Sequence, residues 1–197
     1  MTRSRQTADW GSRAGLAKIV PSSVAVGSGT GSADALGTVT FATASSVSPN
    51  GVFTSTYKTY ILNINLTSGT ADAALYLKMR ASGTDNSTNY YYAMNNLKTN
   101  NTANNYYATN GTSGFLIGEI DGPSSANNWN FTSIVLCNPQ LTLLTNFTST
   151  GTSLDTGGSV NGHSGGGTHA LAASYDAVSL IVSAGTITGS ISIYGYN

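Results

Sequence analysis

The two histidines of the chain, His163 and His169, lie six residues apart in a glycine-rich stretch and have the clearest metal chemistry. Two imidazoles can share a cation, and Asp155 or Asp176 can complete the ligand shell of such a site. The same glycine-rich stretch is also typical of an exposed loop in which both rings are solvated. We favour the exposed loop, and we therefore expect neither a metal ion nor another cofactor.

Two catalytic arrangements can be drawn from the remaining residues. A serine–histidine–aspartate triad would combine Asp155, His163 and one of many serines, but no segment has the strand–turn–helix pattern that presents a nucleophilic serine. Glu119, the only glutamate, and Asp121 would face the same way on a strand, an arrangement that permits a pair of hydrolase carboxylates. A turn signal directly after them favours an exposed loop pair instead. We expect that the protein is not an enzyme.

Tyrosines form two clusters among asparagines. The chain has 11 tyrosines against 5 phenylalanines and 2 tryptophans, and the clusters consist of Tyr90, Tyr91 and Tyr92 and of Tyr106 and Tyr107. Tyrosine combines an apolar ring with a polar tip, which suits protein interfaces and sugar faces. The alternative is that these rings fill the core. Contact with a receptor or partner and core packing both remain open.

Charged residues are scarce. They make up 8% of the sequence, whereas soluble domains usually have roughly 25%. Apolar residues reach 40% and alternate with polar ones, which excludes a disordered chain. A surface of hydroxyls and amides can be covered by another chain at little desolvation cost. The body of the chain has no basic stripe for nucleic acid and no apolar run of membrane-spanning length.

Cys137 is the only cysteine, so the chain cannot form an internal disulfide. It follows the apolar run Ile134 to Leu136, and we therefore expect a small buried side chain rather than a nucleophile.

The first 20 residues differ from the rest of the chain. Half of the eight basic residues lie there, and this is the only stretch with plausible helical character. No apolar segment follows the basic residues, so we expect no secretory signal. Residues 21–36 are rich in serine and glycine and are interpreted as a linker, with a domain boundary near residue 35.

From residue 37 onward, short alternating segments recur at the spacing of a β-sandwich. The clearest are residues 57–66, 74–80, 130–137 and 187–196; weaker signals lie at 38–41, 90–94, 114–120, 141–147 and 178–182. Long loops are expected at residues 95–112 and 149–170. The sequence therefore predicts an all-β protein, a jelly-roll-like antiparallel β-sandwich spanning residues 37–197.

Several of these motifs resemble those of small tailed-bacteriophage (cyanophage-like) virion appendage proteins. The segment 52–62, Val-Phe-Thr-Ser-Thr-Tyr-Lys-Thr-Tyr-Ile-Leu, resembles their opening strand, and Leu-Lys-Met-Arg-Ala-Ser-Gly-Thr at 77–84 resembles their second strand. Ile-Ser-Ile-Tyr-Gly-Tyr at 191–196 resembles their C-terminal strand, and Arg-Gln-Thr-Ala-Asp-Trp at 5–10 resembles the basic leader that attaches fibre proteins to the virion. The resemblance covers the leader and most of the β domain.

The resemblance implies a homotrimeric structural protein of the virion, either a capsid decoration protein or head fibre, or a tail-fibre tip that recognises host surface glycan. Residues 1–20 would be the virion-anchoring leader, and its partners would be capsid or tail proteins. The residues expected to make this attachment are Arg3, Arg5, Trp10, Arg13, Leu16 and Lys18. We expect assembly in the host cytoplasm and no role for nucleic acid or membrane. A carbohydrate-active enzyme or a free lectin is the more distant alternative.

Overall fold

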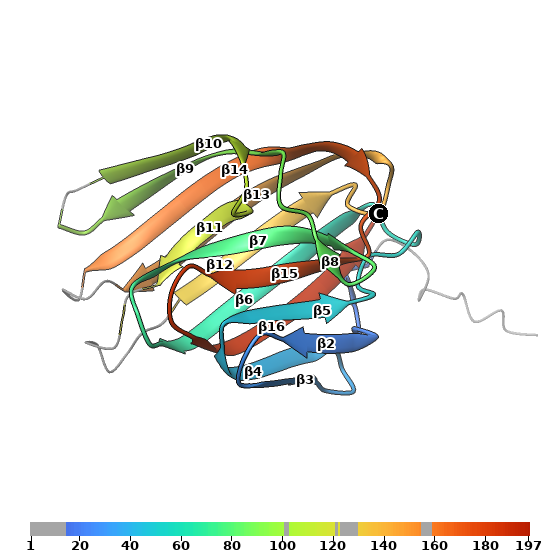
Figure 1. Ribbon diagram of the computed structural model, residues 1–197, viewed down its shortest axis with the longest axis horizontal. Coiled ribbons are helices and arrows are strands. Elements are labelled where there is room, and N and C mark those ends of the chain that lie inside the picture. Colours follow the sequence, from blue (N-terminus) through green and yellow to red (C-terminus); the bar gives the residue numbers. More distant parts are fainter. Residues whose placement is uncertain (1–14, 101–102, 121, 123–129, 155–158) are drawn as a thin grey trace, which may run out of the picture.

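The computed structural model describes residues 15–100, 103–120, 122, 130–154 and 159–197. Two antiparallel sheets pack face to face as a β-sandwich, and none of the described residues is helical (Figure 1). The expected all-β antiparallel sandwich is therefore confirmed. No helix in the described part of the chain is long and apolar enough to span a membrane.

The larger sheet has ten strands, in the order β10-β9-β14-β13-β12-β6-β16-β4-β3, with β1 beside the end of β16. Their bounds are β10 (Ala103–Gly111), β9 (Tyr90–Lys98), β14 (Val160–Ala173), β13 (Leu143–Leu154), β12 (Asn130–Cys137), β6 (Thr59–Gly69), β16 (Ile187–Tyr196), β4 (Thr38–Ala44), β3 (Thr30–Ala33) and β1 (Ala17–Lys18).

The smaller sheet has six strands, in the order β11-β7-β15-β5-β2, with β8 beside β7. Their bounds are β11 (Phe115–Ile120), β7 (Ala73–Ala81), β15 (Ala177–Val182), β5 (Ser46–Asn50), β2 (Ser23–Val26) and β8 (Thr84–Asp85).

Alternating side chains build the core between the two sheets. On β6 and β16, Ile64 lies opposite Ile191 and Leu62 opposite Ile193, and all four are at most 2% exposed. Residues at alternate positions of a strand point to one face, so the intervening polar residues of both strands point to the other side of the sheet. Complete burial of each such side chain contributes roughly 1.5–3 kcal/mol to the stability of the fold.

Aromatic rings fill the part of the core beneath β11. Phe115 of β11 packs on Phe147 of β13 with ring centroids 4.0 Å apart, and Tyr90 meets Phe115 edge-on at 4.9 Å. The Tyr90 hydroxyl accepts a hydrogen bond from the Met79 amide at 3.0 Å and donates one to the Asn86 carbonyl at 2.9 Å. The buried phenol therefore ties β9 to β7 across the sandwich.

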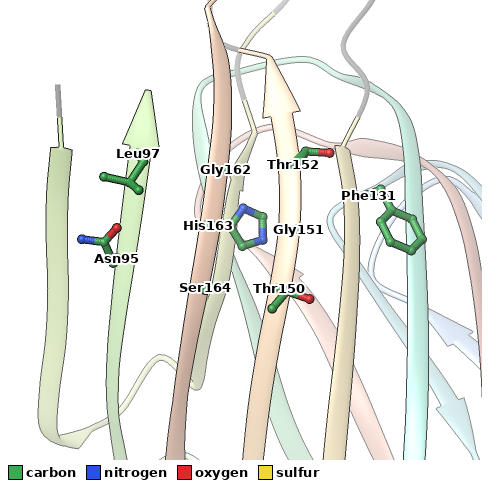
Figure 2. Close-up of a pocket in the computed structure, with 9 residues that line it drawn as sticks. All are labelled: Asn95, Leu97, Phe131, Thr150, Gly151, Thr152, Gly162, His163 and Ser164. Carbon is green, nitrogen blue, oxygen red and sulfur yellow. The ribbon is translucent and has the colours of Figure 1, made fainter. Parts of the chain in front are cut away.

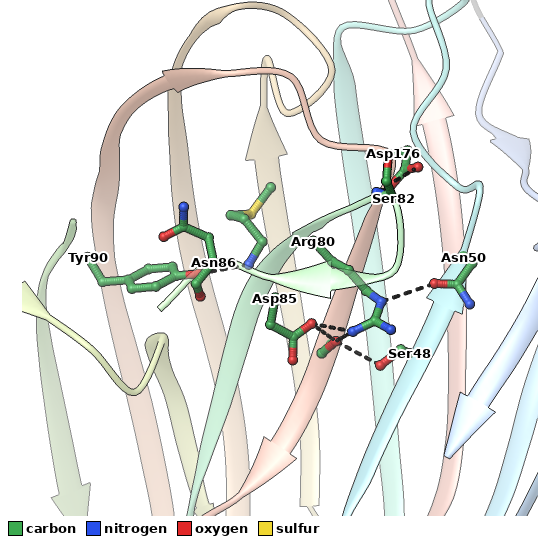
Figure 3. Close-up of polar contacts among 10 residues, drawn as sticks. Ser48, Asn50, Arg80, Ser82, Asp85, Asn86, Tyr90 and Asp176 are labelled. Carbon is green, nitrogen blue, oxygen red and sulfur yellow. Dashed lines mark hydrogen bonds and ion pairs between the residues drawn. The ribbon is translucent and has the colours of Figure 1, made fainter. Parts of the chain in front are cut away.

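A polar network holds the short β8 segment against the outside of the smaller sheet (Figure 3). Asp85 Oδ1 accepts hydrogen bonds from Arg80 Nη1 and from Ser179 Oγ, both at 2.6 Å. Ser179 and Ser48 are buried, and their hydroxyls lie 2.7 Å apart. Arg80 Nε also donates to Asn50 Oδ1 at 3.2 Å, so the network connects β7, β15 and β5.

The interpretation of residues 21–36 as a linker is wrong for the strands β2 and β3, which join the smaller and the larger sheet respectively. Val24 and Val26 pack against the core. Gly29 supplies the positive φ (+69°) that the turn between the two strands requires. Residues 15–20 also depart from the expected helical character, because Ala17 and Lys18 pair with β16 as a strand.

The two long loops expected at residues 95–112 and 149–170 are also wrong, because β9 with β10 and β13 with β14 form antiparallel pairs there. Three of the glycines of β14, Gly165, Gly166 and Gly167, are strand residues in close contact with their neighbours. A Cβ on Gly167 would collide with the carbonyl oxygen of Tyr91 on β9. Glycine is required at this position by the close approach of the adjacent backbone.

Candidate functional site

His169 is buried and fully engaged by neighbouring groups. Its Nε2 lies 3.0 Å from the Thr88 carbonyl oxygen, so this nitrogen carries the proton and donates. Its Nδ1 lies 3.1 Å from the Tyr175 hydroxyl, which then acts as the donor. The expected solvated ring is therefore wrong, and His169 serves as a core residue whose pKa is lowered by burial.

His163 is also buried rather than exposed, on the inner side of β14. Its Nε2 lies 3.3 Å from the Thr132 hydroxyl, which donates a 3.0 Å bond to Asn130 Oδ1. Burial lowers the pKa of His163, while the nearby Glu119 charge acts in the opposite direction. Asp155 lies outside the described residues. The structure therefore does not test the triad that would include Asp155, or the role of Asp155 as a metal ligand.

No three His, Cys, Asp or Glu side chains gather within the described ranges in a way that could hold a metal ion. Asp176 lies elsewhere, where its carboxylate accepts from the Ser82 amide at 3.3 Å.

Glu119 is half-buried on β11 and is the centre of a network between the sheets. Its Oε1 accepts a 2.5 Å hydrogen bond from the Tyr106 hydroxyl, and its Oε2 accepts a 2.7 Å bond from Asn96 Nδ2. Asn130 donates to its backbone carbonyl at 2.9 Å. The expectation of an exposed loop position is therefore wrong for Glu119. Asp121, its proposed carboxylate partner, lies outside the described residues.

The Glu119 network adjoins a polar cleft of about 340 Å³, which is also lined by Asp72, Lys98 and Asn104. The interior behind it is unusually polar. Asn96 Oδ1, Ser153 Oγ and both polar atoms of the Asn161 side chain are buried without a hydrogen-bond partner among the described residues. These strands therefore surround a polar interior at one end of the sandwich, whereas the opposite end is packed with aromatic rings.

The structure separates the five tyrosines of the two clusters. Tyr90 is a core residue, Tyr92 is half-buried, and the Tyr106 hydroxyl donates a hydrogen bond to Glu119. Tyr91 and Tyr107 are exposed, at 39% and 80%. Only these last two present a large part of the ring to a partner.

The outer face of the ten-stranded sheet, which points away from the smaller sheet, is almost without charge. Along its described strands the only charged side chain is that of Lys18 on β1, at the border, where it donates to the Thr38 hydroxyl. One row across this face consists, in pairing order, of Asn105, Asn95, Ser164, Thr150, Ser133, Asn63, Ser192 and Thr38. Amides and hydroxyls thus extend across eight neighbouring strands.

Cys137 also lies on the outer face, opposite Asn146, and is half-buried. The expectation of a core position was wrong because the inward residues of β12 are Asn130, Thr132, Ile134 and Leu136. Asn130 and Thr132 are polar, yet they alternate in step with the core residues Ile134 and Leu136. This pattern was the sequence signal that could have revealed the network around Glu119.

A hollow of about 430 Å³ lies on the outer face, over β9, β14, β13 and β12 (Figure 2). The exposed side chains of Leu97 and Phe131 lie at its two sides, and Gly162 and Thr152 lie between them. A second hollow of about 350 Å³ shares Asn95 and Ser164 with the first and extends to Tyr107. Tyr107 is among the contact residues predicted from the sequence, whereas Phe131 and Leu97 are not.

Four of the residues expected to attach the protein to a virion, Arg3, Arg5, Trp10 and Arg13, lie outside the described residues. Leu16 is 55% exposed, directly before β1, and is available to a partner.

Comparisons of the chain with protein-family models, with curated proteins and with solved structures find no match.

Proposed function

We propose that the protein is a non-catalytic structural component of a tailed-bacteriophage virion. In this proposal it is a homotrimeric surface decoration or head-fibre protein, attached to the particle by its N-terminal segment. The observation that carries the proposal is the nearly uncharged outer face of the ten-stranded sheet. Burying an ionised group without a partner is far more costly than burying a hydroxyl that finds a hydrogen bond, so part of this face can be covered permanently by another chain.

The part of this face best suited to contact a second copy is the assembly patch, which we define as Val135, Ile61 and Tyr194. These side chains lie in register on β12, β6 and β16 and form a short apolar row between polar rows. Each is only partly buried within one chain. Contact between copies would remove their remaining apolar surface from water, at about 25 cal/mol per Å².

The interior of the sandwich supports a structural role rather than catalysis. Both histidines contact core residues, and both oxygens of the Glu119 carboxylate accept hydrogen bonds from neighbouring side chains. A general acid or base must reach a substrate proton. Such bonds are instead typical of groups that hold strands together.

Quantitative mass spectrometry of purified phage particles tests the location. A decoration protein should be present in hundreds of copies per particle, whereas a tail-fibre tip should be present in a few dozen copies or fewer. Absence of the chain from particles would contradict the virion proposal. The exposed rings of Tyr107 and Phe131 support the alternative role, that of a receptor-binding tail-fibre tip.

A further inference from the structure

The hollow beside the assembly patch has the form of a trough with apolar sides. In register across four strands lie Leu97, Gly162, Thr152 and Phe131. Leu97 and Phe131 are 59% and 46% exposed. Neighbouring strands lie about 4.8 Å apart, so these two side chains are separated by about 14 Å across smaller residues.

The floor of the trough is open because of Gly162. A Cβ placed on Gly162 would meet no atom within 4 Å, and its backbone is free of positive φ. The hollow above this position is therefore not filled by side chains from neighbouring strands. A larger residue there would enter the trough without disturbing the sheet.

Amides and hydroxyls line the next row of the trough. Asn95 Nδ2 donates to Asn105 Oδ1 at 2.7 Å, and this is the one hydrogen bond that their side chains make among the described residues. A side-chain amide has two donor hydrogens and an oxygen with two lone pairs. Asn95 Oδ1 and Asn105 Nδ2 therefore keep hydrogen-bonding capacity, and the hydroxyls of Ser164 and Thr150 follow in the same row.

An exposed aromatic ring stands at the β10 side. Tyr107, on β10, pairs with Ala93, and Gly166 follows on β14. Because its neighbours in this row are so small, the ring is left 80% exposed. Exposed aromatic rings beside a hollow are typical of surfaces that stack on a partner.

Among the described residues, neither hollow is lined by an Asp, Glu, Lys or Arg side chain. His163 also lines the first hollow, and burial lowers its pKa, which favours the neutral ring. The chemistry therefore does not match a phosphate, a sulfate or a nucleic acid, each of which is recognised through cationic groups. A neutral sugar chain matches it, since it offers hydroxyls that both donate and accept and C–H faces that stack on rings.

We propose that this trough binds a neutral oligosaccharide. Sugar rings stack on Tyr107 and Phe131, and their hydroxyls bond to Asn95, Asn105 and Ser164. Together the two hollows fall within the usual size of ligand sites, 300–1,000 Å³. The inference goes beyond the assembly role and does not depend on it, because the trough and the assembly patch have no residue in common.

The test uses the full chain on a glycan array of neutral hexose and N-acetylhexosamine oligosaccharides, with sialylated and sulfated oligosaccharides on the same array. Binding to neutral members is expected, followed by titration calorimetry with the best of them. Gly162→Leu, which fills the trough, should abolish binding, and Tyr107→Ala should weaken it about tenfold through loss of ring stacking. Thr40→Leu, on the same sheet outside the trough, and Tyr76→Ala, on the smaller sheet, should bind as the wild type does.

The native mass of each variant is measured alongside. A Gly162→Leu variant that keeps its native mass and loses binding supports the proposal, whether or not the protein is a trimer. Absence of binding to every neutral glycan would overturn it, as would binding restricted to charged glycans or unaffected by Gly162→Leu. If Gly162→Leu changes the native mass, the trough is a subunit contact and the inference is wrong.

Discussion

The Tyr106 hydroxyl lies 2.5 Å from Glu119 Oε1, and this contact joins the edge strand β10 of the larger sheet to β11 of the smaller one. Asn96 of β9 donates to the other carboxylate oxygen. The only glutamate of the chain thus connects both sheets at the polar end of the sandwich. A bond to an ionised group is worth more than one between neutral groups, about 1.5–3 kcal/mol.

The pairing predicts an alkaline transition. Burial, followed by the hydrogen bond and the charge of Glu119, raises the pKa of Tyr106 to about 12. A folded-state pKa above the unfolded value of about 10 stabilises the fold below pH 10, and this contribution disappears as the pH rises from 10 to 12. In Glu119→Gln the pKa of Tyr106 should fall, as followed by ultraviolet absorbance of the phenolate.

Tyr175 is the internal control for this titration. Its pKa is also raised to about 12, but by burial alone, so the Glu119→Gln substitution should leave it unchanged. An unaltered titration of all tyrosines in Glu119→Gln would contradict the assigned contact.

The buried histidines predict a loss of stability in acid. Burial lowers the pKa of both His163 and His169 in the folded state. The unfolded chain takes up these protons near pH 6.5, so stability should fall as the pH drops below that value. Urea unfolding at pH 7.5 and at pH 5 measures the difference. Nitrogen NMR should show His169 as the tautomer protonated at Nε2; imidazoles that titrate at or above pH 6.5 would disagree with this arrangement.

Replacing each of two glycines of β14 by alanine should change the stability of the fold in different directions. In Gly167→Ala the new methyl group would collide with the Tyr91 carbonyl, and overpacking of this kind costs about 1–3 kcal/mol. In Gly162→Ala the methyl group enters open space, and the stiffer unfolded chain should leave stability unchanged or raise it by about 0.4–1 kcal/mol. Thermal and urea unfolding of both variants measures this, and equal effects would show that β14 is not packed as described.

Strands with regular alternation could be predicted from the sequence. The predicted bounds of β12 and β16 agree with the structure, and the predicted segments 57–66 and 74–80 largely coincide with β6 and β7. Strands built from small residues could not, because β2, β3 and β14 owe their conformation to neighbouring strands. Glycine in such a strand has the same local signature as glycine in a loop.

The candidate sites were harder to predict for a related reason. Tyr106 and Tyr107 are adjacent in the sequence, yet one bonds to Glu119 and the other is exposed on the outer face. The trough combines residues of two separate stretches of the sequence, β9 with β10 and β12 to β14. Phe131 and Leu97 face the same trough only because β14 pairs with β9, which no local pattern indicates.

Sedimentation of the full-length protein at micromolar concentration tests the central claim of assembly through the outer face. The account predicts a particle of three 20.2 kDa chains. Ile61→Lys, which places a charge in the assembly patch, should shift it to the monomer, while Ala25→Lys, at an exposed position of the smaller sheet, should leave it trimeric. A wild-type protein that sediments as a monomer, or a trimer that tolerates Ile61→Lys, would contradict the account.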